Sequence, residues 1–435
     1  MFVLAPYFAL RGWHRGQPWS SFRERLGWLP VRVRECTTAS DSSGGAIWIH
    51  AVSVGEVLAA KPLLDGLKRM FPQRAVFVST TTDTGQKLAR ERLEVADGIF
   101  YFPLDWVVPV RRALRAIRPA CVIVMETEIW PNFLREARRS AVPVVFANAR
   151  ISEKSFARFK EWEFMVGPFY RRTMEDATRF LAQSPEDAER LVEMGAAEDR
   201  VEVIGNLKYD AEPPTRGVFA NWLAEQIAQQ ERWPVVVAGS VVAGEEDAVL
   251  AAYDNVQRQW RRTLMVLAPR KPDRFETAAR KVAEGGWKVV RRSELDLSRP
   301  LDESADVLLL DSIGELAALY SMADATFVGG SLVPSGGHNI LEPAQFSRPP
   351  VFGPHMENFR QMADQFLDAR AGAQVTTGSA LGTVWMQLIE NVPMREQLGR
   401  AAKQIADGNR GATQRALARI VEVLDARGDS DGARR

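Results

Sequence analysis

The sequence predicts an α/β protein of two domains, each built around a parallel sheet with helices on both faces. The chain has 435 residues, which is more than a single hydrophobic core usually holds. From Ala46 onward, short apolar runs alternate with amphipathic segments, as they do where strands and helices alternate. This rhythm is interrupted between Asn206 and Thr215, where two prolines and several turn-forming residues indicate a linker.

Seven apolar runs before the linker have the length and composition of buried strands. Amphipathic stretches separate them, and Leu63, Leu64 and Leu67 show the spacing of one helix face. The predicted strands of the first domain cover residues 46–52, 75–80, 98–102, 121–125, 143–148, 179–183 and 201–205.

The same pattern repeats after the linker. Helices are expected at Glu245–Val256 and Gly314–Tyr320, and a helical run from Gln387 to Ala426 either caps the second domain or crosses back to the first. Two Rossmann-like domains follow, whose strand carboxyl ends are expected to face a shared cleft. The predicted strands of the second domain cover residues 234–239, 263–268, 288–290, 306–311, 325–330 and 350–353.

These features divide the chain into five expected segments. They are a membrane-associating segment (1–34), a first Rossmann-like domain (35–206), a linker (207–216), a second Rossmann-like domain whose last helix crosses back in one alternative (217–428) and a tail (429–435).

The composition argues against two classes of function. Lysine and arginine number 56 against 55 acidic residues, which is not the balance of a nucleic-acid-binding protein, although local basic patches remain compatible with it. Cys36 and Cys121 are far apart and no cysteine–histidine cluster exists, so we expect free thiols in a reducing compartment and no metal site.

The N-terminal segment has the character of an interfacial anchor. Met1–Leu10 is apolar but too short to span a bilayer, and an excess of arginine with Trp13, Trp19 and Trp28 follows it. We expect it to lie on an anionic membrane surface. The alternative is an amphipathic helix that packs on the first domain.

A glycine-rich stretch, Phe327–Pro343, has the features of a phosphate site at the end of an apolar strand. Two glycine pairs would let the backbone approach a ligand, and Asn339 opens a segment whose free amides and helix dipole would favour an anion. Glu342 follows within reach of sugar hydroxyls. A purely structural glycine turn is the alternative for this motif alone.

Three glutamates follow predicted strands of the first domain. Glu56 stands where the first strand becomes a helix, so it is either a helix cap or a general base whose pKa is tuned by its surroundings. Glu126 and Glu128 follow a buried strand, and if that strand continued they would point to opposite faces.

Together these motifs resemble the 3-deoxy-D-manno-octulosonic acid (Kdo) transferases of lipopolysaccharide synthesis, in the same order along essentially the whole chain. The motifs are RERLG at Arg23, IHAVSVGE at Ile49, PLD at Pro103, ETEIWPN at Glu126, GNLKYD at Gly205, APR at Ala268, GEL at Gly314 and GGSLVPSGGHNILEP at Gly329.

The resemblance implies a GT-B fold and the transfer of Kdo, with inversion, from CMP-Kdo to a lipid A precursor. It places the enzyme at the cytoplasmic face of the inner membrane and implies no cofactor and no nucleic-acid partner. Because the leaving group is a phosphate that protein donors can stabilise, no metal is expected.

The resemblance also suggests roles for individual residues. Glu56 would be the general base, with Glu126 and Glu128 orienting acceptor or donor, and Lys208 is a candidate for neutralising charge. The residues expected to bind the donor are Ser240, Arg270, Gly329, Gly330, Ser331, Gly336, Gly337, His338, Asn339 and Glu342.

The chain departs from the family pattern in two places. Val241 and Val242 stand where many members carry a threonine and a histidine, and Lys271 stands where histidine is common. The first departure removes polar groups near the expected donor site and puts in doubt any role for that pair.

Two other functions are compatible with a double Rossmann fold. One is a GT-B enzyme with a different nucleotide sugar, or a related epimerase, and the other is a binding protein without chemistry. The retained Glu56, Glu126 and Glu342 speak against the binding protein.

Overall fold

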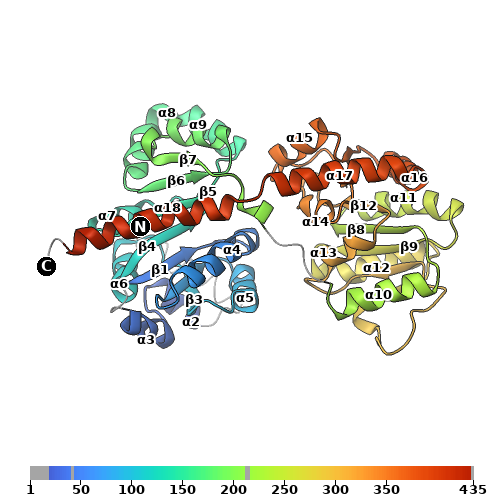
Figure 1. Ribbon diagram of the computed structural model, residues 1–435, viewed down its shortest axis with the longest axis horizontal. Coiled ribbons are helices and arrows are strands. Elements are labelled where there is room, and N and C mark those ends of the chain that lie inside the picture. Colours follow the sequence, from blue (N-terminus) through green and yellow to red (C-terminus); the bar gives the residue numbers. More distant parts are fainter. Residues whose placement is uncertain (1–18, 41–43, 211–215, 433–435) are drawn as a thin grey trace. The chain divides into compact units, whose positions relative to one another are not determined.

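The computed structural model describes residues 19–40, 44–210 and 216–432 and divides the chain into two compact units (Figure 1). Unit 1 takes in the chain up to Ala211 and again from Asn409, and unit 2 is the continuous stretch Glu212–Gly408. Each unit contains one seven-stranded sheet in which every pairing is parallel, so the predicted α/β class with two Rossmann-like units is confirmed.

Unit 1 is built on the strand order β3-β2-β1-β4-β5-β6-β7, and all seven strands predicted before the linker are present. The strands are β1 (Ala46–His50), β2 (Val76–Thr80), β3 (Gly98–Tyr101), β4 (Pro119–Met125), β5 (Val144–Ala149), β6 (Arg179–Ala182) and β7 (Val201–Val203). The helices are α2 (Trp19–Arg25), α3 (Val31–Ser40), α4 (Val54–Met70), α5 (Asp83–Arg92), α6 (Val107–Ile117), α7 (Pro131–Arg139), α8 (Glu153–Met174), α9 (Pro185–Glu193) and α18 (Ala412–Gly432).

The central strands of unit 1 read as continuous apolar runs because both faces of the sheet are covered. All seven residues of β4 are buried. One face packs against α3, α6, α7, α8 and α9 through a core that includes Trp48, Phe133 and Phe180. The other face packs against α4, α5 and α18 through a core that includes Ile49, Leu63 and Ile420.

The last helix, α18, belongs to unit 1, which answers the question that the sequence left open. Its Leu417 fits against Gly66 of α4, where any side chain at position 66 would collide with it. The carboxylate of Asp210 accepts hydrogen bonds from the amides of Gly411 and Thr413, just before and within the start of α18. The chain therefore crosses between the units twice.

Unit 2 has the strand order β10-β11-β9-β8-β12-β13-β14, and the six predicted strands are present. The sequence missed the two-residue β14 at the sheet edge, which is too short to produce a pattern. The strands are β8 (Val235–Val241), β9 (Leu264–Pro269), β10 (Val289–Arg291), β11 (Val307–Leu309), β12 (Ala325–Val328), β13 (Val351–Phe352) and β14 (Ala373–Gln374).

The helices of unit 2 agree less well with the predicted bounds. The helix expected at Gly314–Tyr320 is only the short α13, followed by a 3₁₀ turn, and the predicted Gln387–Ala426 run is three separate helices. The helices are α10 (Val218–Gln229), α11 (Glu246–Gln259), α12 (Phe275–Glu284), α13 (Leu316–Leu319), α14 (Leu341–Ala344), α15 (Arg360–Asp368), α16 (Gly378–Glu390) and α17 (Val392–Gly408).

The predicted membrane-associating segment is described only from residue 19. Met1–Leu10 and Trp13 lie outside the described residues. Leu29 and Val33 are buried in the core of unit 1, so this part of the segment packs on the domain. Trp28 remains exposed, with the Arg112 guanidinium 4.7 Å from the centre of its ring. None of the helices in the described part of the chain is long and apolar enough to cross a bilayer.

Candidate functional site

Glu56 lies in the first turn of α4, directly after β1 at the carboxyl edge of the unit 1 sheet. The helix begins here because the Ser53 hydroxyl accepts a hydrogen bond from the Glu56 amide. The Glu56 carboxylate in turn accepts hydrogen bonds from the Ser53 hydroxyl at 2.7 Å and from the Val52 amide at 2.8 Å. This arrangement is close to a capping box. Glu56 therefore caps its helix, which was one of the two roles that the sequence left open for it.

The same carboxylate has an acid strength suited to proton transfer near neutral pH. Burial is the main cause that raises the pKa of Glu56 from 4.5 to about 7, and the negative charges of Glu126 and Glu128 add to it. The two hydrogen bonds lower the pKa without cancelling this effect. A carboxylate with this pKa is matched to general-base work at physiological pH.

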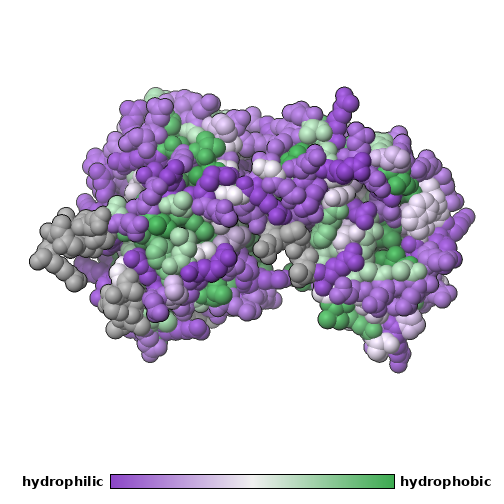
Figure 2. Space-filling model, viewed as in Figure 1, coloured by the Kyte–Doolittle hydropathy of each residue, from purple (hydrophilic) through white to green (hydrophobic). Residues whose placement is uncertain are grey.

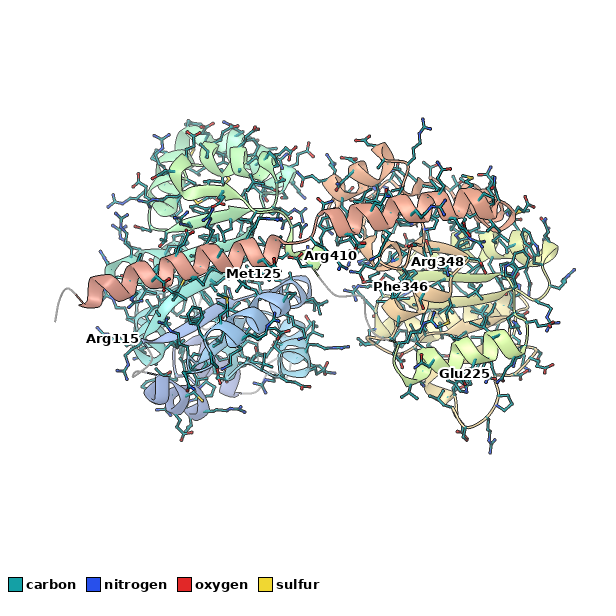
Figure 3. The ribbon with its side chains drawn as sticks, in the orientation of Figure 1. Arg115, Met125, Glu225, Phe346, Arg348 and Arg410 are labelled. Atoms are coloured by element: carbon teal, nitrogen blue, oxygen red, sulfur yellow. The ribbon has the colours of Figure 1, made fainter. Side chains whose placement is uncertain are left out.

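Glu126 and Glu128 follow β4, whose last residue is Met125 (Figure 3). The strand does not continue through them, because Glu126 takes a left-handed backbone conformation with φ 52° and turns the chain. The negative charges of both carboxylates add to the effect of burial that raises the pKa of Glu56. The pKa of Glu128 is itself raised, mainly by burial and to a smaller extent by the charge of Glu126. The turn therefore gathers three glutamates at one sheet edge.

Lys208 lies in a 3₁₀ turn, Leu207–Asp210, that packs on unit 1. The side-chain oxygen of buried Asn148, at the end of β5, accepts a hydrogen bond from the Leu207 amide and fixes this turn. The Lys208 ammonium lies 3.2 Å from a carboxylate oxygen of Glu126. The structure thus brings the predicted charge-neutralising lysine to one of the predicted glutamates.

His50, at the end of β1, is a core residue. Its ring stacks on Phe102 with 3.8 Å between centroids, and its Nδ1 lies 3.0 Å from the Ser79 hydroxyl. Burial lowers its pKa to about 3, so the imidazole is neutral at physiological pH.

In unit 2, the buried carboxylate of Glu245 organises the glycine-rich turn. One oxygen accepts hydrogen bonds from the amides of Ser331 and Leu332, each at 2.8 Å. The other accepts from the amides of Gly330 at 2.7 Å and Val242 at 3.0 Å. Four backbone donors therefore converge on one side chain of the protein itself.

This arrangement explains why Gly329 is a glycine and revises the expected role of its neighbours. A side chain at position 329 would come within 2.8 Å of the Glu245 carboxylate and collide with the backbone of Ser240. The amides of Gly330 and Ser331, which the sequence assigned to a phosphate, instead donate to Glu245. The Ser331 hydroxyl donates to the Val328 carbonyl. These groups hold the loop in shape.

Arg270 interacts electrostatically with His338 and Glu342, which lie in a segment far from it in the chain. Arg270 is exposed after β9, and its charge lowers the pKa values of both His338 and Glu342. Burial is the larger cause in each case: it lowers the pKa of His338 to about 4 and raises that of Glu342 to about 7. His338 Nε2 is buried and has no hydrogen-bond partner within the described residues. With its pKa lowered to about 4, this imidazole is neutral at physiological pH.

Three of the remaining donor-site candidates lie in the same loop, and the fourth, Ser240, lies in β8. Gly336 and Gly337 adopt left-handed conformations, and the Gly337 amide donates to the Gly330 carbonyl, which folds the loop back on itself. The Asn339 side chain accepts from the Leu341 amide at 3.2 Å. Ser240, the last residue but one of β8, has φ 56°. The helix expected after Asn339 is the four-residue α14, which is too short to carry the dipole that the sequence argument invoked.

Sequence reasoning did not assign a role to Glu245 or to Asn148. The signal for Glu245 was its place in an acidic run just after a strand, but no pattern indicates that a carboxylate will point inward at amides 85 residues away. Across residues 19–40, 44–210 and 216–432, no group of three or more His, Cys, Asp and Glu side chains is arranged to hold a metal ion.

Comparisons with known proteins agree with the resemblance noted from the motifs. Residues 20–211 match the family described as 3-deoxy-D-manno-octulosonic-acid transferase (kdotransferase). The chain is 33% identical over 382 residues to a 3-deoxy-D-manno-octulosonic acid transferase of Haemophilus influenzae, covering 87% of each chain. It is 32% identical over 445 residues to the enzyme of that name from Bordetella pertussis, covering 97% of each.

A solved structure of a putative UDP-N-acetylglucosamine 2-epimerase from Listeria monocytogenes is similar in fold. The TM-score is 0.60 at 13% identity, and the match covers 88% of this chain and 97% of the other. At this identity the likeness concerns architecture alone.

Proposed function

Because the chain belongs to the 3-deoxy-D-manno-octulosonic acid transferase family, we propose that it transfers Kdo from CMP-Kdo to a lipid A precursor with Glu56 as the general base. The observation that carries the assignment of the base is the buried Glu56 carboxylate, whose pKa is raised to about 7 beside two further glutamates. The reaction belongs to lipopolysaccharide synthesis.

The proposed step is a single displacement with inversion. A hydroxyl oxygen of the acceptor sugar forms a bond to the anomeric carbon of Kdo while the bond from that carbon to the phosphate oxygen of CMP breaks. The electron pair of the broken bond leaves with CMP, and the hydroxyl proton passes to the Glu56 carboxylate. Each Glu56 oxygen already accepts one hydrogen bond, which fixes its orientation and leaves a further lone pair on each for the proton.

Glu126 and Glu128 support this base. Their negative charges add to the effect of burial, which is the main cause of the raised pKa of Glu56, and Lys208 balances one of these charges through its contact with Glu126. We assign Glu126 the larger share of orienting the acceptor, because its backbone and its ion pair both fix it in place.

On the donor side, Arg270 and His338 are assigned to the anionic groups of CMP-Kdo. The Arg270 guanidinium is exposed and can form a bidentate contact with phosphate or carboxylate. Glu342 is assigned to the ribose hydroxyls, with Ser240, Gly336, Gly337 and Asn339 as further contacts. Gly329, Gly330 and Ser331 contribute by holding this loop on Glu245.

The departure at Val242 leaves the backbone of the site in place. Its amide donates to Glu245 at 3.0 Å, a contact that does not depend on the side chain. A role for the polar pair found in other members is therefore not needed for the loop geometry.

The acceptor chemistry places the enzyme at an anionic membrane surface, at the cytoplasmic face of the inner membrane. The N-terminal segment is the proposed attachment, and Trp28 in its described part is exposed. The reaction needs no metal, because the Arg270 guanidinium can stabilise the departing phosphate.

Mass spectrometry of a lipid A precursor after incubation with the full chain and CMP-Kdo tests the proposal. Wild type should add one or more Kdo units, and Glu56→Gln should add none in the same time. Glu94→Gln, an exposed glutamate of the same unit, is the matched control and should behave as wild type. No Kdo gain with folded wild type that is stabilised by CMP would refute the acceptor, and stabilisation by UDP in place of CMP would refute the donor.

A further inference from the structure

Helix α8 of unit 1 contacts its own domain over a narrow face. Of its 22 residues, Phe159, Thr173 and Met174 are buried, and Phe156 and Tyr170 are among those that pack partly on the core. The rest of a helix about 33 Å long faces outward.

That outward surface carries four large apolar side chains. Trp162 is 48% exposed, Phe164 79%, Met165 61% and Phe169 56%. Trp162, Met165 and Phe169 have the i, i+3, i+7 spacing of one stripe, and Phe164 lies on the side that borders the neighbouring helix α7. Single exposed apolar residues are ordinary, but four on one helix are typical of a surface that contacts another protein or a membrane. In Figure 2, hydrophobic residues lie among hydrophilic ones where α8 and α9 are placed in Figure 1.

A basic groove of about 970 Å³ adjoins these side chains between α7 and α8. Three acidic residues also line it, of which Asp176 pairs with Arg138 at 2.9 Å and Glu163 with Lys160 at 3.1 Å. Within the part of the chain that the structure describes, Arg171 and Arg172 have no ion pair. The groove is lined by exposed Arg135, Arg138, Arg139, Arg171 and Arg172.

We propose that the outer surface of α8 and the adjoining arginine groove form a membrane-contact surface for an anionic bilayer. Aromatic and aliphatic side chains of this size enter the headgroup region, where Trp162 is especially suited. Arginines beside them bind lipid phosphates, and each basic residue near an anionic surface strengthens binding. An excess of arginine over carboxylate beside exposed aromatic residues complements such a surface.

The position of α8 fits the proposed chemistry. It begins a few residues after β5, at the same carboxyl edge of the sheet that carries Glu56 and Glu126. A bilayer contact on this helix would bring a lipid acceptor to the unit that holds the proposed base. To this extent the inference rests on the proposed function, but vesicle binding can be measured independently of sugar transfer.

The test is co-sedimentation of the full chain with vesicles of phosphatidylcholine, with and without phosphatidylglycerol. Arg171→Gln/Arg172→Gln should lower the partition coefficient for the anionic vesicles about tenfold or more and change little with phosphatidylcholine alone. Phe164→Ser/Phe169→Ser should lower partition to both. The N-terminal segment is the same in every variant, so the ratio of each variant's partition coefficient to that of wild type reports the contribution of α8 alone.

Matched controls on other surfaces of unit 1 are Arg92→Gln/Arg115→Gln and Met70→Ser/Val95→Ser, all at exposed positions. They should bind vesicles as wild type does. Binding of the α8 variants within about twofold of wild type, with unchanged circular dichroism, would overturn the proposal. The proposal would also be overturned if wild type formed a dimer in light scattering and the α8 variants lost it while they still bound vesicles. The surface would then join two copies of the chain.

Kdo transfer to a detergent-dispersed acceptor separates this proposal from the proposed function. The α8 variants should keep this activity, because no side chain of the candidate site is altered. Absence of transfer in wild type would refute the enzyme assignment and leave the vesicle result standing.

Discussion

Glu56 of unit 1 and Glu245 of unit 2 are both buried glutamates next to a strand end, yet their surroundings differ. Glu56 accepts hydrogen bonds from one amide and one hydroxyl, and burial, together with the smaller effect of two neighbouring glutamates, raises its pKa to about 7. Glu245 accepts four amides from two segments. The hydrogen-bond donors around a buried carboxylate therefore determine its function. Glu56 has lone pairs left to accept a proton, whereas the lone pairs of Glu245 accept backbone amides and fix the loop.

The largest expected effect comes from removing the base. Glu56→Gln should lower kcat for Kdo transfer by about 10²- to 10⁴-fold, since that is the usual contribution of a positioned proton acceptor. Stabilisation by CMP should stay unchanged, because the variant leaves unit 2 intact. A loss of less than about tenfold would assign the proton to another group.

Glu245→Gln should affect structure and donor binding first. An amide side chain has one acceptor oxygen and directs N–H groups at backbone donors, so several buried amides lose their partner at a cost of about 1–3 kcal/mol each. We expect a lower melting temperature and loss of CMP stabilisation, with Glu284→Gln on the exposed end of α12 as the control. Normal CMP binding by the variant would show that the loop does not depend on this carboxylate.

The pH dependence of stability should report the raised pKa of Glu56. Because its pKa is higher when folded (about 7) than its ordinary 4.5, its favourable contribution is complete below about pH 4.5 and is lost as the pH rises through 7. The difference between wild type and Glu56→Gln in the free energy of unfolding should shift in favour of the variant between pH 4.5 and 8, by on the order of 3 kcal/mol. Urea titrations at several pH values measure it, and parallel curves would contradict the raised pKa.

His338 and His355 give a smaller contrast within unit 2. His338→Ala removes a buried imidazole whose Nε2 has no partner among the described side chains, and we expect at least about a tenfold loss in kcat/KM. His355→Ala, at a half-exposed histidine beside Glu357, should change kcat/KM little. Equal losses for the two variants would remove His338 from the donor site.

The smallest expected effect is a shift in the pH–rate profile. Glu126→Gln removes a negative charge that raises the pKa of Glu56, so the rising limb of kcat/KM should move to lower pH by less than about one unit. Lys208→Met removes the cation that balances Glu126, so it should move the limb the other way. Movement of both variants in the same direction would contradict this electrostatic account.

The sequence predicted the fold better than the details of the site. Apolar runs such as Cys121–Met125 identify a strand buried on both faces, and the glycine-rich and acidic motifs identified the correct strand ends. The left-handed turn at Glu126 was not foreseen, because a non-glycine residue in this conformation is held by its surroundings. The hydrogen bond from the Gly330 amide to Glu245 was not predicted either, because it joins segments that are far apart in the chain.

The return of α18 to unit 1 has a consequence for how the protein is made. Unit 2 is continuous in the chain, but one face of the unit 1 core, including Leu63 and Leu67, is closed by residues that follow all of unit 2. During synthesis the ribosome therefore releases most of unit 1 with this apolar face still uncovered, and unit 2 can fold before it is closed. The unit that is synthesised first is the one completed last.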